Sequence, residues 1–360
     1  MKVIANYLPQ FHEIEENNEW WGKGFTEWTN TKKGRPLFRN HYQPIEPKED
    51  NYYDLMNKET IKWQTKIAQD NSIYGFAYYH YWSNGKKLLE KPAENLLQWK
   101  DINQRFCFVW ANHDWKRSWD GTSEILIKQE YGNEKNWIEH FNYLKQFFED
   151  ERYIKIDNKP VFGIYDSSKI KDMDKMIRTW NELSIQNGGN GVYIVEILRN
   201  KYSNVNLIKE SNAIIISEPS FALENMSFFY RALTKVELKL HKLYNKKCLR
   251  SYSYSKIVNI SLKYSKKIKV DKKIFFGGFT SWDNSSRHGN RGYVIKGSTP
   301  EKFKKYLANI KELSEENGSE YVFVNAWNEW CEGMYLEPDK KFGYRYLEAV
   351  KEVVGQNDKI

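Results

Sequence analysis

The stretch that decides the fold is VFVNAWNEWCEGMYLEP, which occupies residues 322–338. Its first three residues form an apolar run of β-branched and aromatic side chains, which suits a fully buried strand. The chain then turns polar, and two carboxylates, Glu329 and Glu332, follow three positions apart. In a helical turn, residues at this spacing lie on one side, with Cβ atoms about 5–6 Å apart. The pattern therefore predicts a buried strand that ends in two neighbouring carboxylates.

Two carboxylates in an aromatic cleft that excludes water do not ionise equally. Repulsion and desolvation raise the pKa of one of them, so that one residue type supplies both an acid and a base. Chemistry at a glycosidic bond needs this division. The alternative is a solvated acidic loop in which Trp327 and Trp330 are core residues. The tryptophan pair, the NEW string at residues 328–330 and Gly333 favour the catalytic interpretation.

The string WNEWCEGMYLEP, residues 327–338, resembles the catalytic signature of glycoside hydrolase family 99. It is closer still to the WbsX-like proteins, which are encoded in polysaccharide biosynthesis loci. The resemblance runs from about residue 3 to 345 and is interrupted after residue 222. Five more strings share it: NYLPQFH (6–12), WWGKGFTEWTNTKKGRPLFRNHYQP (20–44), FAYYHYW (76–82), FVWANHDW (108–115) and NKPVFGIYD (158–166).

The resemblance implies a (β/α)₈ barrel that acts on glycans, with Glu329 and Glu332 as the catalytic pair and a manno-configured sugar as substrate. It implies that Glu329 acts as a base on the sugar's own 2-hydroxyl. Glu332 would serve as acid and then as base at the leaving group. WbsX-like proteins have often been labelled glycosyltransferases, so cleavage and transfer both stay open.

Strand-like runs alternate with helical patterns along the chain, and this alternation predicts parallel βαβ units that close into one TIM barrel over residues 1–360. An open, doubly wound sheet is the alternative, but no GxGxxG or GxxxxGK[ST] turn supports it. The expected helices include Lys58 to Asn71, Glu134 to Glu149, Asp172 to Gln186, Pro300 to Asn317 and Lys340 to Val354. The eight expected strands are Val3 to Leu8, Tyr74 to Tyr79, Phe106 to Ala111, Val161 to Tyr165, Val192 to Ile197, Ala213 to Ser217, Ile274 to Phe279 and Tyr321 to Asn325.

Polar and aromatic side chains gather where these strands end, which is where a barrel enzyme carries its active site. Taken singly, each has a simpler explanation, such as a hydrogen-bonded structural histidine or a tryptophan packed beneath a loop. Together they supply flat rings and polar groups, as a sugar site requires. The predicted substrate-binding residues are Tyr7, Gln10, His12, Trp28, His80, Tyr81, Trp82, Asn112, His113, Trp115, Glu218, Trp282, Asp283, Arg287, Trp327, Asn328 and Trp330.

No metal or other cofactor is predicted, because His12, His80, His113 and Asp114 show no HxH, HxxxH or HExxH spacing. The three cysteines are scattered and indicate no disulfide framework. No apolar stretch approaches the roughly 18–20 residues that cross a bilayer, and the N-terminus turns polar too soon for a signal peptide. The expected location is the cytoplasm.

A basic segment, residues 223–273, departs from the barrel pattern between strands six and seven. It carries 14 Lys or Arg against three acids, a net +11, whereas the whole chain is +9, so the remainder is −2. Apolar residues recur at helical spacing from Phe228 to Tyr244 with lysines mostly opposite, which is typical of a helix on an anionic membrane surface. The alternative is a hairpin packed over the barrel with a solvated lysine face. Nucleic acid is not an expected partner, since no recognition motif accompanies the charge.

Three functions therefore stay open. The first is a family 99-type enzyme that acts on an oligosaccharide or polysaccharide, in which a lipid-linked precursor of a surface glycan would be a sensible substrate. The second is a WbsX-type glycosyltransferase of O-antigen or capsule biosynthesis, which the expected cytoplasmic location favours. The third is a glycan-binding barrel without catalysis, against which the intact pair Glu329 and Glu332 argues.

Overall fold

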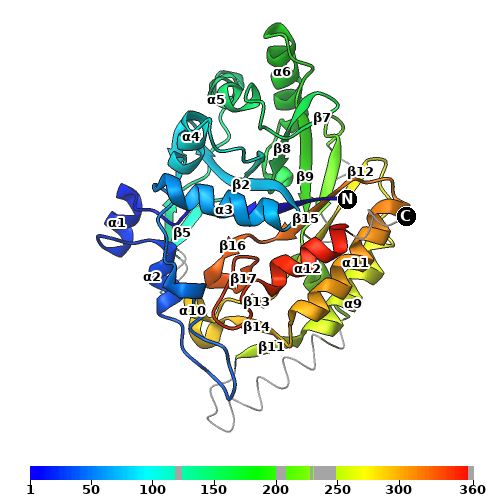
Figure 1. The fold of residues 1–360 in the computed structure, drawn as a ribbon. Helices are drawn as coiled ribbons and strands as arrows, with labels where there is room; N and C mark the ends of the chain where they lie inside the picture. The colour runs from blue at the N-terminus through cyan, green and yellow to red at the C-terminus, as the bar shows by residue number, and fades with distance from the viewer. Residues whose placement is uncertain (118–123, 200–207, 228–229, 231–248, 356–360) are drawn as a thin grey trace.

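The computed structural model describes residues 1–117, 124–199, 208–227, 230 and 249–355 (Figure 1). Eight parallel strands form its centre, and the first pairs with both the second and the last, so that the sheet closes. This confirms the predicted (β/α)₈ barrel. In barrel order the strands are β1 (Lys2–Tyr7), β2 (Ile73–Ser83), β4 (Phe106–Trp110), β8 (Lys159–Ile164), β9 (Tyr193–Leu198), β10 (Ala213–Ile216), β12 (Lys273–Phe279) and β15 (Tyr321–Asn325).

Amphipathic helices cover the outside of the barrel, and their ends follow from local sequence signals. Asn57 caps α3 by accepting from the Glu59 amide at 3.0 Å, and Thr299 followed by Pro300 begins α11. The helices are α1 (Glu15–Trp21), α2 (Glu27–Lys32), α3 (Lys58–Asp70), α4 (Lys91–Gln98), α5 (Glu134–Phe148), α6 (Met173–Gln186), α7 (Ser220–Glu224), α9 (Tyr254–Ser265), α10 (Ser285–His288), α11 (Pro300–Glu316) and α12 (Arg345–Val354).

The last helix begins later than the sequence pattern predicts. We expected Lys340 to open it, but α12 starts at Arg345. Asp339 accepts a hydrogen bond from the Phe342 amide, and Gly343 adopts φ +57°, which a helix interior does not allow. A turn therefore occupies the first residues of the expected helix.

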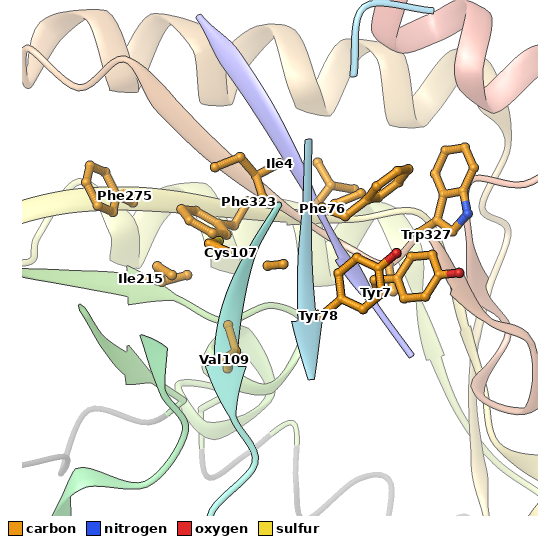
Figure 2. Packing of buried hydrophobic residues seen from close by; sticks show 14 of the residues in the cluster. Ile4, Tyr7, Phe76, Tyr78, Cys107, Val109, Ile215, Phe275, Phe323 and Trp327 are labelled. Carbon is orange, nitrogen blue, oxygen red and sulfur yellow. The ribbon is translucent and has the colours of Figure 1, made fainter. Parts of the chain in front are cut away.

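The side chains of each barrel strand alternate between the interior and the helix layer. Ile4 and Phe323 occupy paired positions of β1 and β15 and lie in the barrel interior, whereas Tyr7 and Tyr78 stack outside it at 4.1 Å between ring centroids (Figure 2). The alternation has a period of two residues. It decides which residues at a strand end can reach a central pocket.

Short strands extend the loops at the carboxyl ends of the barrel. β3 (Lys86–Leu88) pairs with the end of β2, and β5 (Trp115–Arg117) pairs with β6 (Glu124–Ile127). At the other end of the barrel, β7 (Lys155–Ile156) pairs with the first residues of β8. Three strands, β11 (Arg250–Ser253), β14 (Tyr293–Lys296) and β13 (Trp282–Asp283), form a small separate sheet, and β16 (Asn328–Glu329) pairs with β17 (Met334–Tyr335).

Part of the basic segment 223–273 packs on the barrel. In α9, Tyr254 and Ile257 are buried, and the Tyr254 hydroxyl donates to the Phe279 carbonyl at 3.0 Å. Five lysines of α9 and the turn after it are exposed: Lys256, Lys263, Lys266, Lys267 and Lys269. Apart from residue 230, the expected amphipathic helix over residues 228–244 lies outside the described residues. In the part of the chain that is described, no helix combines the length and hydrophobicity needed to span a membrane.

Candidate active site

A pocket of about 400 Å³ opens at the carboxyl ends of the barrel strands, and we call it the catalytic pocket. Its wall combines inward-facing residues of β2 with residues from the loops after β1, β4, β8, β12 and β15. The lining residues are Leu8, Gln10, Tyr79, Tyr81, Ala111, His113, Asp114, Trp115, Lys116, Tyr165, Arg287, Glu329 and Glu332.

The two glutamates reach the pocket because the chain after β15 is fixed on both sides. Asn328 accepts from the Leu8 amide at 2.8 Å and donates to the Leu8 carbonyl at 3.0 Å, which ties this segment to the end of β1. Gly333 then turns the chain back with φ +61°, and a Cβ there would lie 2.9 Å from the Asp283 amide nitrogen. Between these two anchors, Glu329 and Glu332 face the same cavity.

The two carboxyls have different surroundings. Burial, together with the charge of Glu332, raises the pKa of Glu329 to about 8, although Arg287 acts in the opposite direction. Glu332 is half-buried and accepts a hydrogen bond from Arg287 Nη1 at 2.8 Å. At neutral pH the pocket therefore favours a protonated Glu329 beside a Glu332 that is paired with Arg287.

Arg287 also pairs with a glutamate outside the pocket, Glu27 of α2. Arg287 Nη2 donates to Glu27 Oε1, and the Glu27 side chain is fully buried. The guanidinium thus bridges two carboxylates, one in the protein interior and one in the pocket. This arrangement fixes the position of Glu332.

Three tyrosines, Tyr79, Tyr81 and Tyr165, also line the pocket. Burial raises the pKa of each hydroxyl, and the charges of Glu329 and Glu332 raise it further. The hydroxyls therefore stay protonated and can donate hydrogen bonds at any ordinary pH. A hydrogen bond with Tyr79 also counteracts the rise in the pKa of Glu329.

Of the predicted site residues, the structure brings seven together in this pocket. They share an inward position or a loop that folds over the rim, and they are Gln10, Tyr81, His113, Trp115, Arg287, Glu329 and Glu332. Trp115 packs against Tyr81 with 5.1 Å between ring centroids, so the two rings form a continuous aromatic wall.

Several other predicted residues point into the helix layer instead. His80 forms a hydrogen bond with His140, with 2.8 Å between their Nε2 atoms, and Trp82 stacks on His140 at 4.5 Å. His80 and Trp82 lie on the outward face of β2, one position from the tyrosines that line the pocket. Six predicted residues are buried outside the pocket, and they are Tyr7, Trp28, His80, Trp82, Trp327 and Trp330.

The remaining predicted residues hold loops or line other spaces. Asn112 exchanges two hydrogen bonds of 2.8 Å with the Asp166 backbone, and Asn328 anchors Leu8 as described. Trp282 and Asp283 line a different pocket. His12 is buried, which lowers its pKa to about 4, and burial raises the pKa of Glu218 to about 8, but neither lines the catalytic pocket.

Sequence reasoning did not include Tyr79, Tyr165, Asp114, Lys116 or Glu27 in the predicted site. The first two were detectable, because they alternate with outward residues in strands that the pattern identified. Glu27 lies 260 positions before its partner Arg287, and no local signal connects them. Within the described residues, no three His, Cys, Asp or Glu side chains cluster as a metal site would require.

Solved structures share this fold. The endo-α-mannosidase of glycoside hydrolase family 99 from Bacteroides thetaiotaomicron superimposes with a TM-score of 0.61 and 15% identity, over 99% of this chain and 97% of that one. A protein described as glycoside hydrolase-like gives a TM-score of 0.62 at 14% identity, over 98% and 93% of the two chains. At these identities the likeness shows a common architecture.

Among curated proteins, the chain is similar to the uncharacterized protein WxcX of Xanthomonas campestris pv. campestris, in two strains. Identity is 28% over 98% of this chain, which spans about half (49%) of the length of WxcX. A family model described as "Glycosyltransferase WbsX" matches residues 3–350. Since this match covers nearly the whole of the 360 residues, the chain belongs to the WbsX family, a membership that supports a carbohydrate-active enzyme.

Proposed function

We propose that this protein is an enzyme that acts at a manno-configured glycosidic bond of a cell-surface polysaccharide or its precursor. The observation that carries the proposal is the pair Glu329 and Glu332 in one pocket, where burial raises the pKa of the first and Arg287 pairs with the second. Two neighbouring carboxyls in different surroundings are what acid–base chemistry at a glycosidic bond requires. The printed descriptions of the family 99 structures support the type of substrate.

In the roles that the resemblance implies, Glu329 takes the proton of the sugar's 2-hydroxyl, whose oxygen bonds to the anomeric carbon, while Glu332 protonates the leaving oxygen as its bond to that carbon breaks. The incoming hydroxyl then bonds to the anomeric carbon in place of the 2-oxygen and gives its proton to the deprotonated Glu332, while Glu329 returns its proton to the 2-oxygen. The pocket itself favours the proton on Glu329. Catalysis in the proposed direction therefore requires that this proton first move to Glu332.

The rest of the pocket suits a sugar. The Tyr81 and Trp115 rings offer apolar faces for the C–H side of a pyranose, and the protonated tyrosine hydroxyls and the Gln10 amide offer hydrogen bonds to its hydroxyls. A pocket of about 400 Å³ is within the usual range for a small-molecule site. These features support a substrate with at least one sugar ring bound between the aromatic wall and the glutamates.

A WbsX-type glycosyltransferase is the second candidate, and membership of that family favours it. It would use the same pocket, but the incoming hydroxyl would belong to a second glycan instead of water. A third candidate, a glycan-binding barrel without catalysis, needs only the aromatic wall and the hydrogen-bonding groups.

One experiment separates the three. The intact chain is incubated with manno-configured oligosaccharides, alone and with an activated mannosyl donor, and products are analysed by mass spectrometry. A glycosidase shortens the oligosaccharides without a donor, whereas a transferase extends them only when the donor is present. The Glu332→Gln variant is the control, since it removes the acid and keeps the side-chain shape. Binding without any product, in the wild type as in the variant, would overturn the enzymatic proposal in favour of the third candidate.

We further propose that the substrate is lipid-linked and that the basic segment 223–273 brings the pocket to the inner leaflet of a membrane. The exposed lysines of α9 support this, because each basic residue near an anionic surface contributes about 1 kcal/mol. The test is co-sedimentation with anionic and neutral liposomes at low and high salt. Selective, salt-sensitive recovery with anionic liposomes is expected, and equal recovery with both would refute membrane contact.

A further inference from the structure

A second pocket of about 310 Å³ lies beside the catalytic pocket. It is built by the loop that contains residues 38–45, by β13 and β14, and by the chain around Lys341. Both pockets are bounded by the same two segments. Asp283 and Gly333 line the second pocket, while Arg287 and Glu332, a few residues away along each segment, line the catalytic pocket.

Three cations surround the second pocket, and among the described residues none of them forms an ion pair. They are Arg39, Lys296 and Lys341, all exposed. Lys296 Nζ lies 3.9 Å from the centre of the Phe38 ring, and Lys341 Nζ lies 4.7 Å from the centre of the Tyr42 ring. Aromatic faces attract these ammonium groups and orient them, but do not neutralise them.

The lining contains one carboxylate, Asp283, whose oxygens are already bonded. One oxygen is 2.6 Å from His41 Nε2 and accepts from the Gln43 amide at 2.8 Å, while the other accepts from the Ser285 amide at 3.0 Å. The pocket thus offers three cations against one carboxylate whose oxygens are already bonded.

We infer that the second pocket binds an anionic group, a phosphate or a carboxylate, that belongs to the glycan on which the catalytic pocket acts. An excess of cationic side chains over carboxylates selects an anion. The aromatic residues Phe38, Trp282 and Phe342 leave apolar surface for the sugar that carries the charge. Since the two pockets share the segments around Asp283 and Gly333, one glycan can extend from one to the other. The link to the glycan rests on the proposed function, whereas anion binding itself does not.

The test measures binding, and therefore does not depend on turnover. Mannose 1-phosphate, glucuronate and neutral mannose are titrated into the intact chain by isothermal calorimetry. Two variants are compared with the wild type: Lys296→Gln with Lys341→Gln, and Lys305→Gln as a matched exposed lysine of α11 outside the pocket. Melting temperatures of all three proteins establish that the substitutions leave the fold intact.

We expect at least one anionic probe to bind, and the double variant to weaken its binding about tenfold or more, the equivalent of 1.4 kcal/mol. Lys305→Gln leaves the affinity unchanged. Stronger binding of mannose 1-phosphate identifies a phosphate as the group, and stronger binding of glucuronate identifies an acidic sugar. The inference is overturned if neither anion binds, if neutral mannose binds equally well, or if the double variant keeps the wild-type affinity. A wild-type protein that binds anions but turns over no glycan would refute the proposed function alone.

Discussion

The two faces of β2 show how one sequence run serves two purposes. In FAYYHYW, residues 76–82, Tyr79 and Tyr81 face the catalytic pocket, whereas His80 and Trp82 face the helix layer and pack on His140 of α5. The side chains on both faces are aromatic and polar, so composition does not distinguish them. What distinguishes them is their position along the strand, because successive side chains point to opposite faces.

The difference separates the residues that line the pocket from those that hold its wall in place. The same division occurs in the WNEWCEGMYLEP stretch, where Glu329 and Glu332 line the catalytic pocket. Glu337, in contrast, is buried outside the pocket and accepts hydrogen bonds from Tyr53 and Trp330. Substitutions of residues that line the pocket should therefore change kcat or KM, whereas substitutions of residues packed behind it should change the free energy of unfolding.

The largest difference is expected between two glutamates of this stretch. Glu329→Gln removes the base and should lower kcat by about 10²–10⁴-fold, the usual contribution of general acid–base catalysis. Glu337→Gln should keep kcat within about twofold, because Glu337 does not line the pocket. The hydrogen bond between residue 337 and Gln64 is preserved in this variant if the Gln64 amide flips. Steady-state kinetics on the same oligosaccharide checks both values. Equal losses in the two variants would contradict the division into two faces.

The tryptophans offer the same contrast in stability. Trp82→Ala should cost about 3–5 kcal/mol of the free energy of unfolding, because it leaves a cavity against His140. Trp115→Ala, on the half-buried pocket wall, should cost about 1 kcal/mol or less and instead raise KM about tenfold. Urea unfolding and kinetics together test this pair. A large stability loss at Trp115 with unchanged KM would place that residue in the packing layer.

A smaller effect is expected from pH. Burial lowers the pKa of His80 to about 3 and that of His140 well below its usual value, so both rings are neutral in the fold. Below about pH 6.5 these two histidines bind protons in the unfolded chain but not in the folded protein. The free energy of unfolding therefore decreases as the pH falls from about 6.5 toward 3. At pH 5 this amounts to about 2 kcal/mol for each ring.

The readout is the slope of the unfolding free energy between pH 7.5 and 5, compared between the wild type and His140→Gln. Comparing slopes cancels the opposite contribution of buried carboxyls such as Glu218, whose raised pKa favours the fold at low pH. We expect a shallower slope in the variant. An unchanged slope would show that the histidine pair does not titrate as described.

The sequence predicted the barrel because its strands are apolar runs separated by helical patterns, and all eight appear within a few residues of the expected positions. It also predicted that Glu329 and Glu332 would lie together, since three positions in one turn determine their spacing. Whether an aromatic side chain at a strand end faces inward depends on its place in the inward–outward alternation of that strand. The prediction did not use this alternation. The contact between Glu27 and Arg287 depends on how distant segments meet after folding, which local patterns do not contain.

The central claim is that Glu332 protonates the leaving group at a glycosidic bond. The most direct measurement compares Glu332→Gln with the wild type on two mannosides, one with an alkyl leaving group and one with an activated aryl leaving group. Since an activated leaving group departs without protonation, the variant should release the alkyl group about 10²–10⁴-fold more slowly in the first turnover, and the aryl group at close to the wild-type rate. Equal losses on both substrates, or near-normal activity on the alkyl mannoside, would contradict the assigned role.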